Sequence, residues 1–217
     1  MIERYTYPPH FVYPKDHVLY ITHHAKKWLD FMPDLLTKPN VTLEVGALFG
    51  GTTPFIMDLY CKLPGSHHYI VDINTNDYLE TNIKPYDNIT FNLGESADVL
   101  RNLSHQGKTK EFLDMAYIDG NHLAKFVLED AVNCFHLVKM GGYMVFDDYT
   151  WGEDQEYHQR PKTAVDAFIA VYKGHVEVVD VGFQVILKKT EYQFNKVEKS
   201  GNYYIDWPFT TKTALKQ

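Results

Sequence analysis

The sequence has no apolar run long enough to cross a membrane. A membrane-spanning helix needs about 18 to 20 consecutive apolar residues, and no stretch of this chain approaches that length. The first residues, MIERYTYPP, also lack the apolar segment of a secretory signal peptide. The sequence therefore predicts a soluble, cytoplasmic protein without a membrane partner.

Basic runs and cysteines are also scarce. No run of Lys or Arg is longer than two residues, and the formal net charge is -7. Such a chain offers no basic stretch to a polyanion, which argues against nucleic acid as the main partner. The two cysteines, Cys61 and Cys134, lie in apolar segments. We therefore predict buried free thiols rather than a disulfide framework.

The chain does contain enough apolar sequence for one domain. It has 217 residues, of which 45% are hydrophobic, so it can bury one core but is too short for two ordinary domains. We expect an N-terminal arm and helix at 1–39, the main domain at 40–190 and a polar tail at 191–217. The tail is predicted to pack on the domain or on a second subunit, as in a homo-oligomer.

Short apolar strands alternate with helical segments along the main domain. Strands are predicted at 41–45, 69–72, 89–93, 115–119, 143–146, 176–181 and 184–188. The last two are too close together for a helix between them, so they should be antiparallel neighbours. The helix that begins near Leu123 is expected to end at Gly141-Gly142. The pattern predicts an α/β fold: a doubly wound, Rossmann-like, seven-stranded sheet, mostly parallel, with one antiparallel strand at the C-terminal hairpin and helices on both faces.

Glycines follow the first predicted strand, in the segment Glu44-Val45-Gly46-Ala47-Leu48-Phe49-Gly50-Gly51-Thr52. Residues without a Cβ can take positive φ and let a ligand approach the backbone. The amides that open the next helix would face that ligand, with Thr52 and Thr53 as cap candidates. The spacing is neither G-x-G-x-x-G nor G-x-x-x-x-G-K-[ST]. We predict a turn that holds an anionic or carboxylate-bearing cofactor.

Acidic residues end four predicted strands, at the sheet edge where open α/β folds bind ligands. They are Glu44, Asp72, Asp119 and Asp147. The segments Asp119-Gly120-Asn121-His122 and Asp147-Asp148-Tyr149 end strands that should be neighbours. Packed carboxylates repel, which raises the pKa of at least one of them, and a hard divalent cation would remove that cost. Asp147 and Asp148 can share an ion only if the chain turns there; otherwise they are solvated turn residues.

Over residues 40–190 the sequence resembles the class I S-adenosylmethionine-dependent methyltransferases. The resemblance includes the first-strand motif, Asp72 and the Gly94-Glu95-Ser96 turn. It implies that Asp72 accepts hydrogen bonds from both ribose hydroxyls and that Glu95 and Ser96 lie beside the adenine. Ser96 is also an ordinary helix-cap candidate, and Glu44 either contacts the methionine end of the cofactor or orders the turn. The predicted cofactor residues are Glu44, Gly46, Gly50, Thr52, Asp72, Glu95, Ser96 and Asp119.

The D-G-N-H and D-D-Y segments resemble a narrower group, the metal-dependent O-methyltransferases that include macrolide-sugar enzymes and methyltransferase-24-type domains. By this resemblance Asp119, Asp147 and Asp148 are Mg²⁺ ligands, and His122 is the base that takes the proton of the substrate hydroxyl. Asp119 and Asp148 are counted with His122 as catalytic residues. The loop 151–160 suits a substrate-facing role. His67 and His68 lack neighbouring ligands in the sequence and are expected to have surface or loop roles.

The expected activity is Mg²⁺-assisted methyl transfer to a hydroxyl of a small molecule. A sugar or sugar-containing metabolite is the first expectation, on the resemblance alone, and a catechol or other phenol is its competitor. Two other functions stay open. One is a non-catalytic scaffold subunit that binds S-adenosylmethionine or a nucleotide. The other is an RNA cap or ribose methyltransferase, against which the acidic composition argues.

Overall fold

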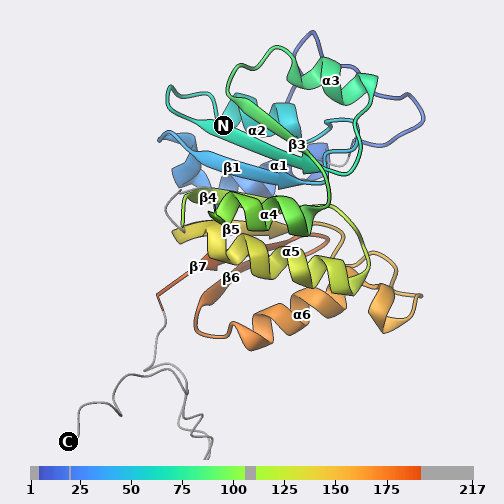
Figure 1. Cartoon of the computed structure of the whole chain (residues 1–217), viewed down its shortest axis with the longest axis vertical. Coiled ribbons are helices and arrows are strands. Elements are labelled where there is room, and N and C mark those ends of the chain that lie inside the picture. The colour runs from blue at the N-terminus through green and yellow to red at the C-terminus, as the bar shows by residue number, and fades with distance from the viewer. Residues whose placement is uncertain (1–4, 20, 106–110, 192–217) are drawn as a thin grey trace, which may run out of the picture.

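The computed structural model describes residues 5–19, 21–105 and 111–191 (Figure 1). Its sheet has seven strands in the order β3-β2-β1-β4-β5-β7-β6. They are β1 (Val41–Val45), β2 (His67–Asp72), β3 (Ile89–Leu93), β4 (Leu113–Ile118), β5 (Val138–Phe146), β6 (Val176–Val181) and β7 (Val185–Lys189). Strand β7 is antiparallel to β5 and to β6, and the other pairs are parallel. The predicted sheet is confirmed.

Helices cover both faces of this sheet (Figure 1). They are α1 (Ile21–Phe31), α2 (Thr53–Leu59), α3 (Asp77–Ile83), α4 (Ser96–His105), α5 (Ala124–Leu137) and α6 (Pro161–Val171), with 3-10 turns at Pro33–Leu36 and Tyr157–Gln159. Successive strand side chains point to opposite faces. In β4, Ala116 and Ile118 accordingly join a core with α4, α5 and α6, while Met115 and Tyr117 join a core with α1 and α2. Within the described residues, no helix combines the length and apolarity that a membrane span requires.

Strand β5 begins earlier than its sequence indicates. Helix α5 ends at Leu137 and β5 starts at Val138, so the prediction that Gly141-Gly142 ends the helix is wrong. The two glycines lie inside β5, beside a register shift in its pairing with β4. Gly141 has φ +80°, and a Cβ on Gly142 would lie 2.8 Å from Val138 Cγ1. The glycine pair therefore belongs to an irregular part of the strand. In sequence, such a pair looks the same as glycines that end a helix.

Both cysteines are buried free thiols, as predicted. The predicted C-terminal tail lies, from residue 192 onward, outside the described residues.

Candidate functional site

The glycine turn between β1 and α2 is packed against the end of β4. Gly46 has φ +84°, and a Cβ at this position would lie 2.1 Å from the carbonyl oxygen of Asp119. Gly50 has φ +72°, and its amide donates to the carbonyl of Ala47 at 2.7 Å. Thr52 is the N-cap residue of α2 but makes no side-chain cap bond, and Pro54 stands in the first turn. Glycine at position 46 is thus required both by φ and by the backbone contact.

Asp72 holds the same turn from the end of β2. Its Oδ2 accepts hydrogen bonds from the amides of Ala47 at 2.9 Å and Leu48 at 3.0 Å, and its Oδ1 accepts from Asn74 N at 3.0 Å. A carboxylate oxygen can accept two bonds. Oδ1 therefore retains capacity for a ligand hydroxyl at this sheet edge.

Glu44 lies beneath the turn rather than at its surface. The residue is 1% exposed, and its Oε2 accepts a hydrogen bond from Thr53 Oγ1 at 2.6 Å. Thr53 is the first residue of α2. Of the two roles considered for Glu44, this hydrogen bond supports the second, in which Glu44 orders the turn and the start of α2.

His68 completes this buried polar group, and its predicted surface or loop role is wrong. It is fully buried in β2, with Nε2 3.3 Å from Glu44 Oε2 and Nδ1 2.8 Å from Thr42 Oγ1. Its burial follows from the pairing of His68 with Thr42 across β1 and β2. A buried acid in β1 requires a polar partner, and that requirement is the one signal in the sequence that points to a buried histidine.

Ser96 and Glu95 lie after β3. Ser96 is the first residue of α4, and its hydroxyl donates to the side chain of Asp130 in α5, while Glu95 is exposed. Asp130 is 2% exposed, and its Oδ1 has no hydrogen-bond partner within the described part of the chain. Burial raises the pKa of Asp130 to about 6, and the charges of Glu129 and Glu95 add to this rise.

We predict that Asp130→Asn stabilises the protein above pH 6. The ordinary pKa of 3.8 applies to the unfolded chain, so ionisation of Asp130 lowers stability as the pH rises from about 4 to about 6. Near pH 8 the variant should gain up to about 3 kcal/mol in free energy of unfolding, and near pH 4 it should gain almost nothing. Urea unfolding at both pH values measures this. Asp98→Asn, at an exposed acid of α4, is the control; identical pH dependence in wild type and Asp130→Asn would contradict the assignment.

Three large apolar side chains stand exposed around this edge of the sheet. They are Leu48 in the glycine turn, Ile73 after β2 and Leu93 at the end of β3. An apolar group of this kind beside polar residues is typical of a ligand site. In the sequence these three residues cannot be told from core residues, because apolar residues at strand ends are typical of a buried core.

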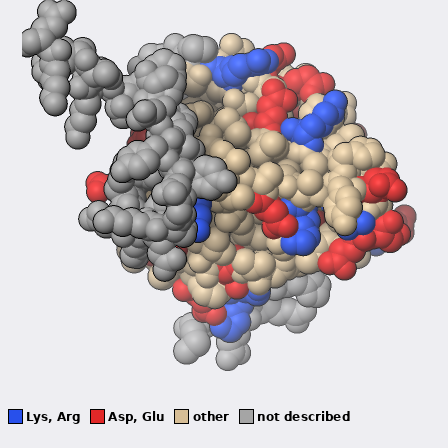
Figure 2. Space-filling view, turned by 90° about the horizontal axis from the view of Figure 1, so that it is seen from below, with Lys and Arg blue, Asp and Glu red and all other residues tan. Residues whose placement is uncertain are grey.

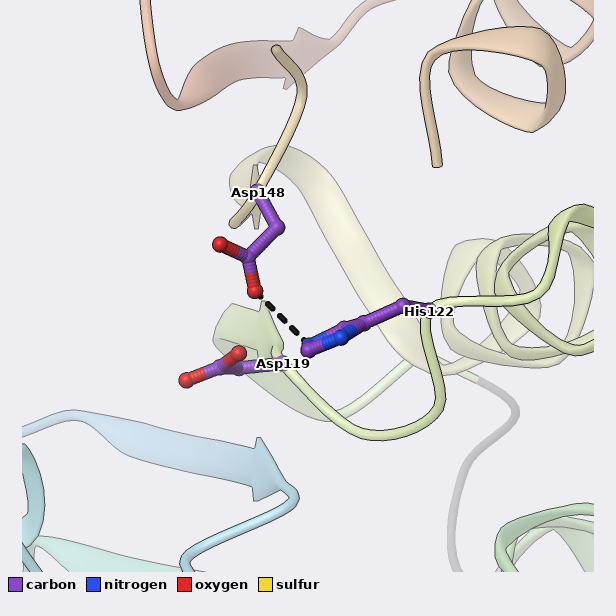
Figure 3. A group of neighbouring side chains, drawn as sticks. All are labelled: Asp119, His122 and Asp148. Atoms are coloured by element: carbon purple, nitrogen blue, oxygen red, sulfur yellow. Dashed lines mark ion pairs between the residues drawn. The ribbon is translucent and has the colours of Figure 1, made fainter. Parts of the chain in front are cut away.

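Asp119, His122 and Asp148 converge at the ends of β4 and β5 (Figure 3). One ligand atom from each lies within 4.8 Å of the others, and His122 Nε2 is 2.8 Å from Asp148 Oδ2. Asp148 has φ +56°, a conformation that asparagine and aspartate tolerate better than most residues. The chain therefore does turn at this aspartate, and the turn brings its carboxylate to His122.

Asp147 is not part of this group. It is buried, its carboxylate accepts a hydrogen bond from the hydroxyl of Tyr117, and its Oδ1 accepts from Asp148 N at 2.8 Å. Asp119 Oδ2 lies 2.9 Å from the same tyrosine hydroxyl. A phenol has one proton to donate, so Tyr117 lies between two carboxylates and can donate to one at a time. The structure brings together two of the three predicted metal ligands, Asp119 and Asp148, with His122.

Burial and mutual repulsion shape the ionisation of this site. Burial, followed by the charges of Asp147 and Asp148, raises the pKa of Asp119 well above its ordinary value. Burial is also the main cause that raises the pKa of Asp147. The hydrogen bond to Asp148 raises the pKa of His122. Carboxylates with such raised pKa values are suited to a cation that removes the repulsion.

Two aromatic residues after β5 differ in their surroundings. Trp151 is 38% exposed, and its ring centroid lies 4.7 Å from that of His122. The hydroxyl of Tyr149 instead donates to Asp166 Oδ1 at 2.7 Å. Trp151, and not Tyr149, therefore lies beside the group formed by Asp119, His122 and Asp148.

Comparisons with known proteins agree with this geometry. The sequence profile of a family described as a methyltransferase domain matches residues 43–149, and no curated protein matches the chain. The solved structure of MycE methyltransferase from the mycinamycin biosynthetic pathway, in complex with Mg and SAH, is 15% identical with a TM-score of 0.62 and covers 84% of this chain and 52% of MycE. This chain thus spans about half the length of MycE.

Two shorter proteins are similar over most of their length. The O-methyltransferase from Bacillus cereus, in complex with SAH, is 16% identical with a TM-score of 0.61, over 85% of this chain and 84% of that one. The N-methyltransferase NodS from Bradyrhizobium japonicum WM9, in complex with S-adenosyl-L-homocysteine, is 14% identical with a TM-score of 0.55, over 82% and 90%. The family match over residues 43–149 and the shared fold together support a class I S-adenosylmethionine-dependent methyltransferase.

Proposed function

We propose that this chain transfers the methyl group of S-adenosylmethionine to a hydroxyl of a small molecule, with Mg²⁺ as an assistant. The observation that carries the proposal is the convergence of Asp119, His122 and Asp148 beside the glycine turn. Two similar structures support it: MycE is in complex with Mg and SAH, and the Bacillus cereus protein is an O-methyltransferase.

The cofactor would lie across the ends of β1, β2 and β3. Gly46 and Gly50 both have positive φ and so set the path of the turn at this edge of the sheet, and Asp72 Oδ1 has capacity for a ribose hydroxyl. Leu48, Ile73 and Leu93 offer exposed apolar surface for the adenine ring. Glu95 and Ser96 stand at the same edge, after β3. In this arrangement Glu44 acts from beneath, through Thr53.

Asp119 and Asp148 are the residues that would hold Mg²⁺. In proteins this ion usually takes one or two carboxylates and keeps other positions for water and substrate oxygens, and the two aspartates meet that requirement. Burial and the charges of Asp147 and Asp148 raise the pKa of Asp119, and a bound cation would offset both effects. When bound, the ion lowers the pKa of an acceptor hydroxyl.

His122 would take the proton of that hydroxyl through Nδ1, because Nε2 is paired with Asp148 Oδ2. Asp148 orients the ring and stabilises the protonated imidazolium that results. Because the methyl group of a sulfonium is already activated, the remaining task is to hold the acceptor oxygen in line with it. Trp151, beside His122, provides an apolar face on which a sugar ring or a phenol can stack.

The two rival functions make different demands on the chain. A scaffold subunit needs the glycine turn but has no use for the His122–Asp148 pair. An RNA methyltransferase needs a basic face. On the face that Figure 2 shows, acidic and basic side chains are interspersed among the described residues, and the whole chain has a net charge of -7.

The test is a methyl-transfer assay with labelled S-adenosylmethionine on panels of sugars, macrolide glycosides and catechols. We expect transfer to at least one hydroxyl acceptor, a large loss of rate with EDTA and recovery with Mg²⁺. Transfer that EDTA leaves unchanged would overturn the role of the metal. Cofactor binding by calorimetry without transfer to any acceptor would favour the scaffold function instead.

A further inference from the structure

The N-terminal arm, residues 5–19, lies against the outer side of the glycine turn. The hydroxyl of Tyr7 donates to the carbonyl of Gly51 at 2.8 Å. The ring of Tyr13 lies 3.1 Å from the position that a Cβ on Gly51 would occupy. The Phe49 ring packs edge-on against Tyr13, with centroids 5.6 Å apart. Arm and turn therefore share both polar and aromatic contacts.

A single buried amide in α3 joins these two segments. Asn82 is fully buried. Its Oδ1 accepts a hydrogen bond from Val12 N at 2.9 Å, and its Nδ2 donates to Val12 O at 2.8 Å and to Phe49 O at 2.9 Å. Both donors of the side chain and its acceptor are thus satisfied. The arm is bonded through both backbone groups of Val12, and the turn through the carbonyl of Phe49.

The bond to Phe49 fixes one peptide plane of the turn. The carbonyl of Phe49 and the amide of Gly50 belong to the same planar unit. Asn82 holds the carbonyl end, and Ala47 O accepts from the Gly50 amide at 2.7 Å. Without the Asn82 donor, a partly buried carbonyl would lose its partner, and the Phe49–Gly50 peptide plane would be held at one end only. Gly50, with φ +72°, offers little steric resistance to rotation.

We propose that Asn82 is a positioning residue for the cofactor: it sets the glycine turn for S-adenosylmethionine and makes the N-terminal arm a structural part of that site. The inference rests on the proposed function only in that the turn binds this cofactor. Asn82 itself touches neither the cofactor nor the acceptor in this proposal. It acts through the Phe49–Gly50 peptide.

The test measures the affinity of Asn82→Ala for S-adenosylhomocysteine by calorimetry, together with steady-state kinetics. We expect the dissociation constant and the KM for S-adenosylmethionine to rise about 10-fold, while kcat at saturating cofactor and the KM for the acceptor stay near wild type. A fold defect alone would lower the active fraction, and hence kcat, without this split. Tyr7→Phe, which removes only the bond from the arm to Gly51, should raise the same two constants about 3-fold and remains informative if Asn82→Ala fails to fold.

The matched control is Asn88→Ala. Asn88 is a partly buried amide that likewise bridges two backbone carbonyls, those of Cys61 and Ser66, each at 3.2 Å, but in loops at the opposite ends of the strands. It should lose stability without a change in cofactor affinity. Wild-type affinity in both Asn82→Ala and Tyr7→Phe would overturn the inference. Failure of the wild-type chain to bind S-adenosylhomocysteine would instead refute the proposed cofactor, so the two failures are distinguishable.

Discussion

Asp148→Asn should lower the rate of methyl transfer by about 10²- to 10⁴-fold and leave the affinity for S-adenosylhomocysteine within about twofold. Asparagine tolerates the φ of +56° at this position, so the turn after β5 is retained while the carboxylate charge is lost. Without that charge, Asp119 is the only carboxylate that remains of the two proposed Mg²⁺ ligands. Rates measured across a Mg²⁺ titration test the expected loss of activity. Calorimetry with S-adenosylhomocysteine tests the expected retention of affinity.

The same variant also changes the dependence of the rate on pH. The bond to Asp148 raises the pKa of His122, and a base must be neutral to accept a proton. Activity of the wild type should therefore rise as the pH rises through that elevated pKa. In Asp148→Asn the residual rate should begin to rise at a lower pH, because the imidazolium has lost its partner. Asp87→Asn, at an exposed acid between α3 and β3, is the control; a parallel loss of cofactor affinity in Asp148→Asn would mean that this aspartate serves the cofactor.

Gly46→Ala should destabilise the fold by about 4 kcal/mol or more and remove cofactor binding. Its Cβ would lie 2.1 Å from the carbonyl oxygen of Asp119, and the residue has φ +84°. Neither partner can move freely, since both are backbone at the end of a strand. Urea unfolding measures the loss of stability, and calorimetry measures the loss of cofactor affinity.

Gly141→Ala separates the two causes of this loss. Gly141 has a similar φ of +80°, but nothing lies within 4 Å of the position of its Cβ. This variant should therefore lose only the conformational term, about 1 to 2 kcal/mol. If Gly46→Ala costs no more than Gly141→Ala, the turn can shift away from β4, and the close contact is not a constraint.

The sheet was predictable because its signals are local. Each strand is a short apolar run between helical segments, and the connection through Gly182 is too short for a helix, which identifies the antiparallel closure by β7. The exact start of β5 was not predictable, because glycines that end a helix and glycines in an irregular strand look alike in sequence. Only the pairing of β5 with β4 distinguishes them.

At the site, the sequence indicated that Asp119, His122 and the Asp147-Asp148 pair follow neighbouring strands, but not which way each side chain points. Asp147 and Asp148 are adjacent, and the positive φ of Asp148 decides that this residue faces His122 while Asp147 faces Tyr117. The burial of His68 depends on its register with Thr42, and the role of Asn82 depends on an arm 70 residues earlier in the chain. Such relations are set by tertiary packing and leave no periodic trace in the sequence.

The close backbone contact between Gly46 and Asp119 also limits how this protein can be recombined with related proteins. A chimera whose crossover falls between β1 and β4 would pair a glycine loop from one parent with an acidic loop from another, across an interface that tolerates no additional atom. Such hybrids should fold only when the parent that supplies the first loop has glycine at the position of Gly46, because the atoms it meets are backbone atoms.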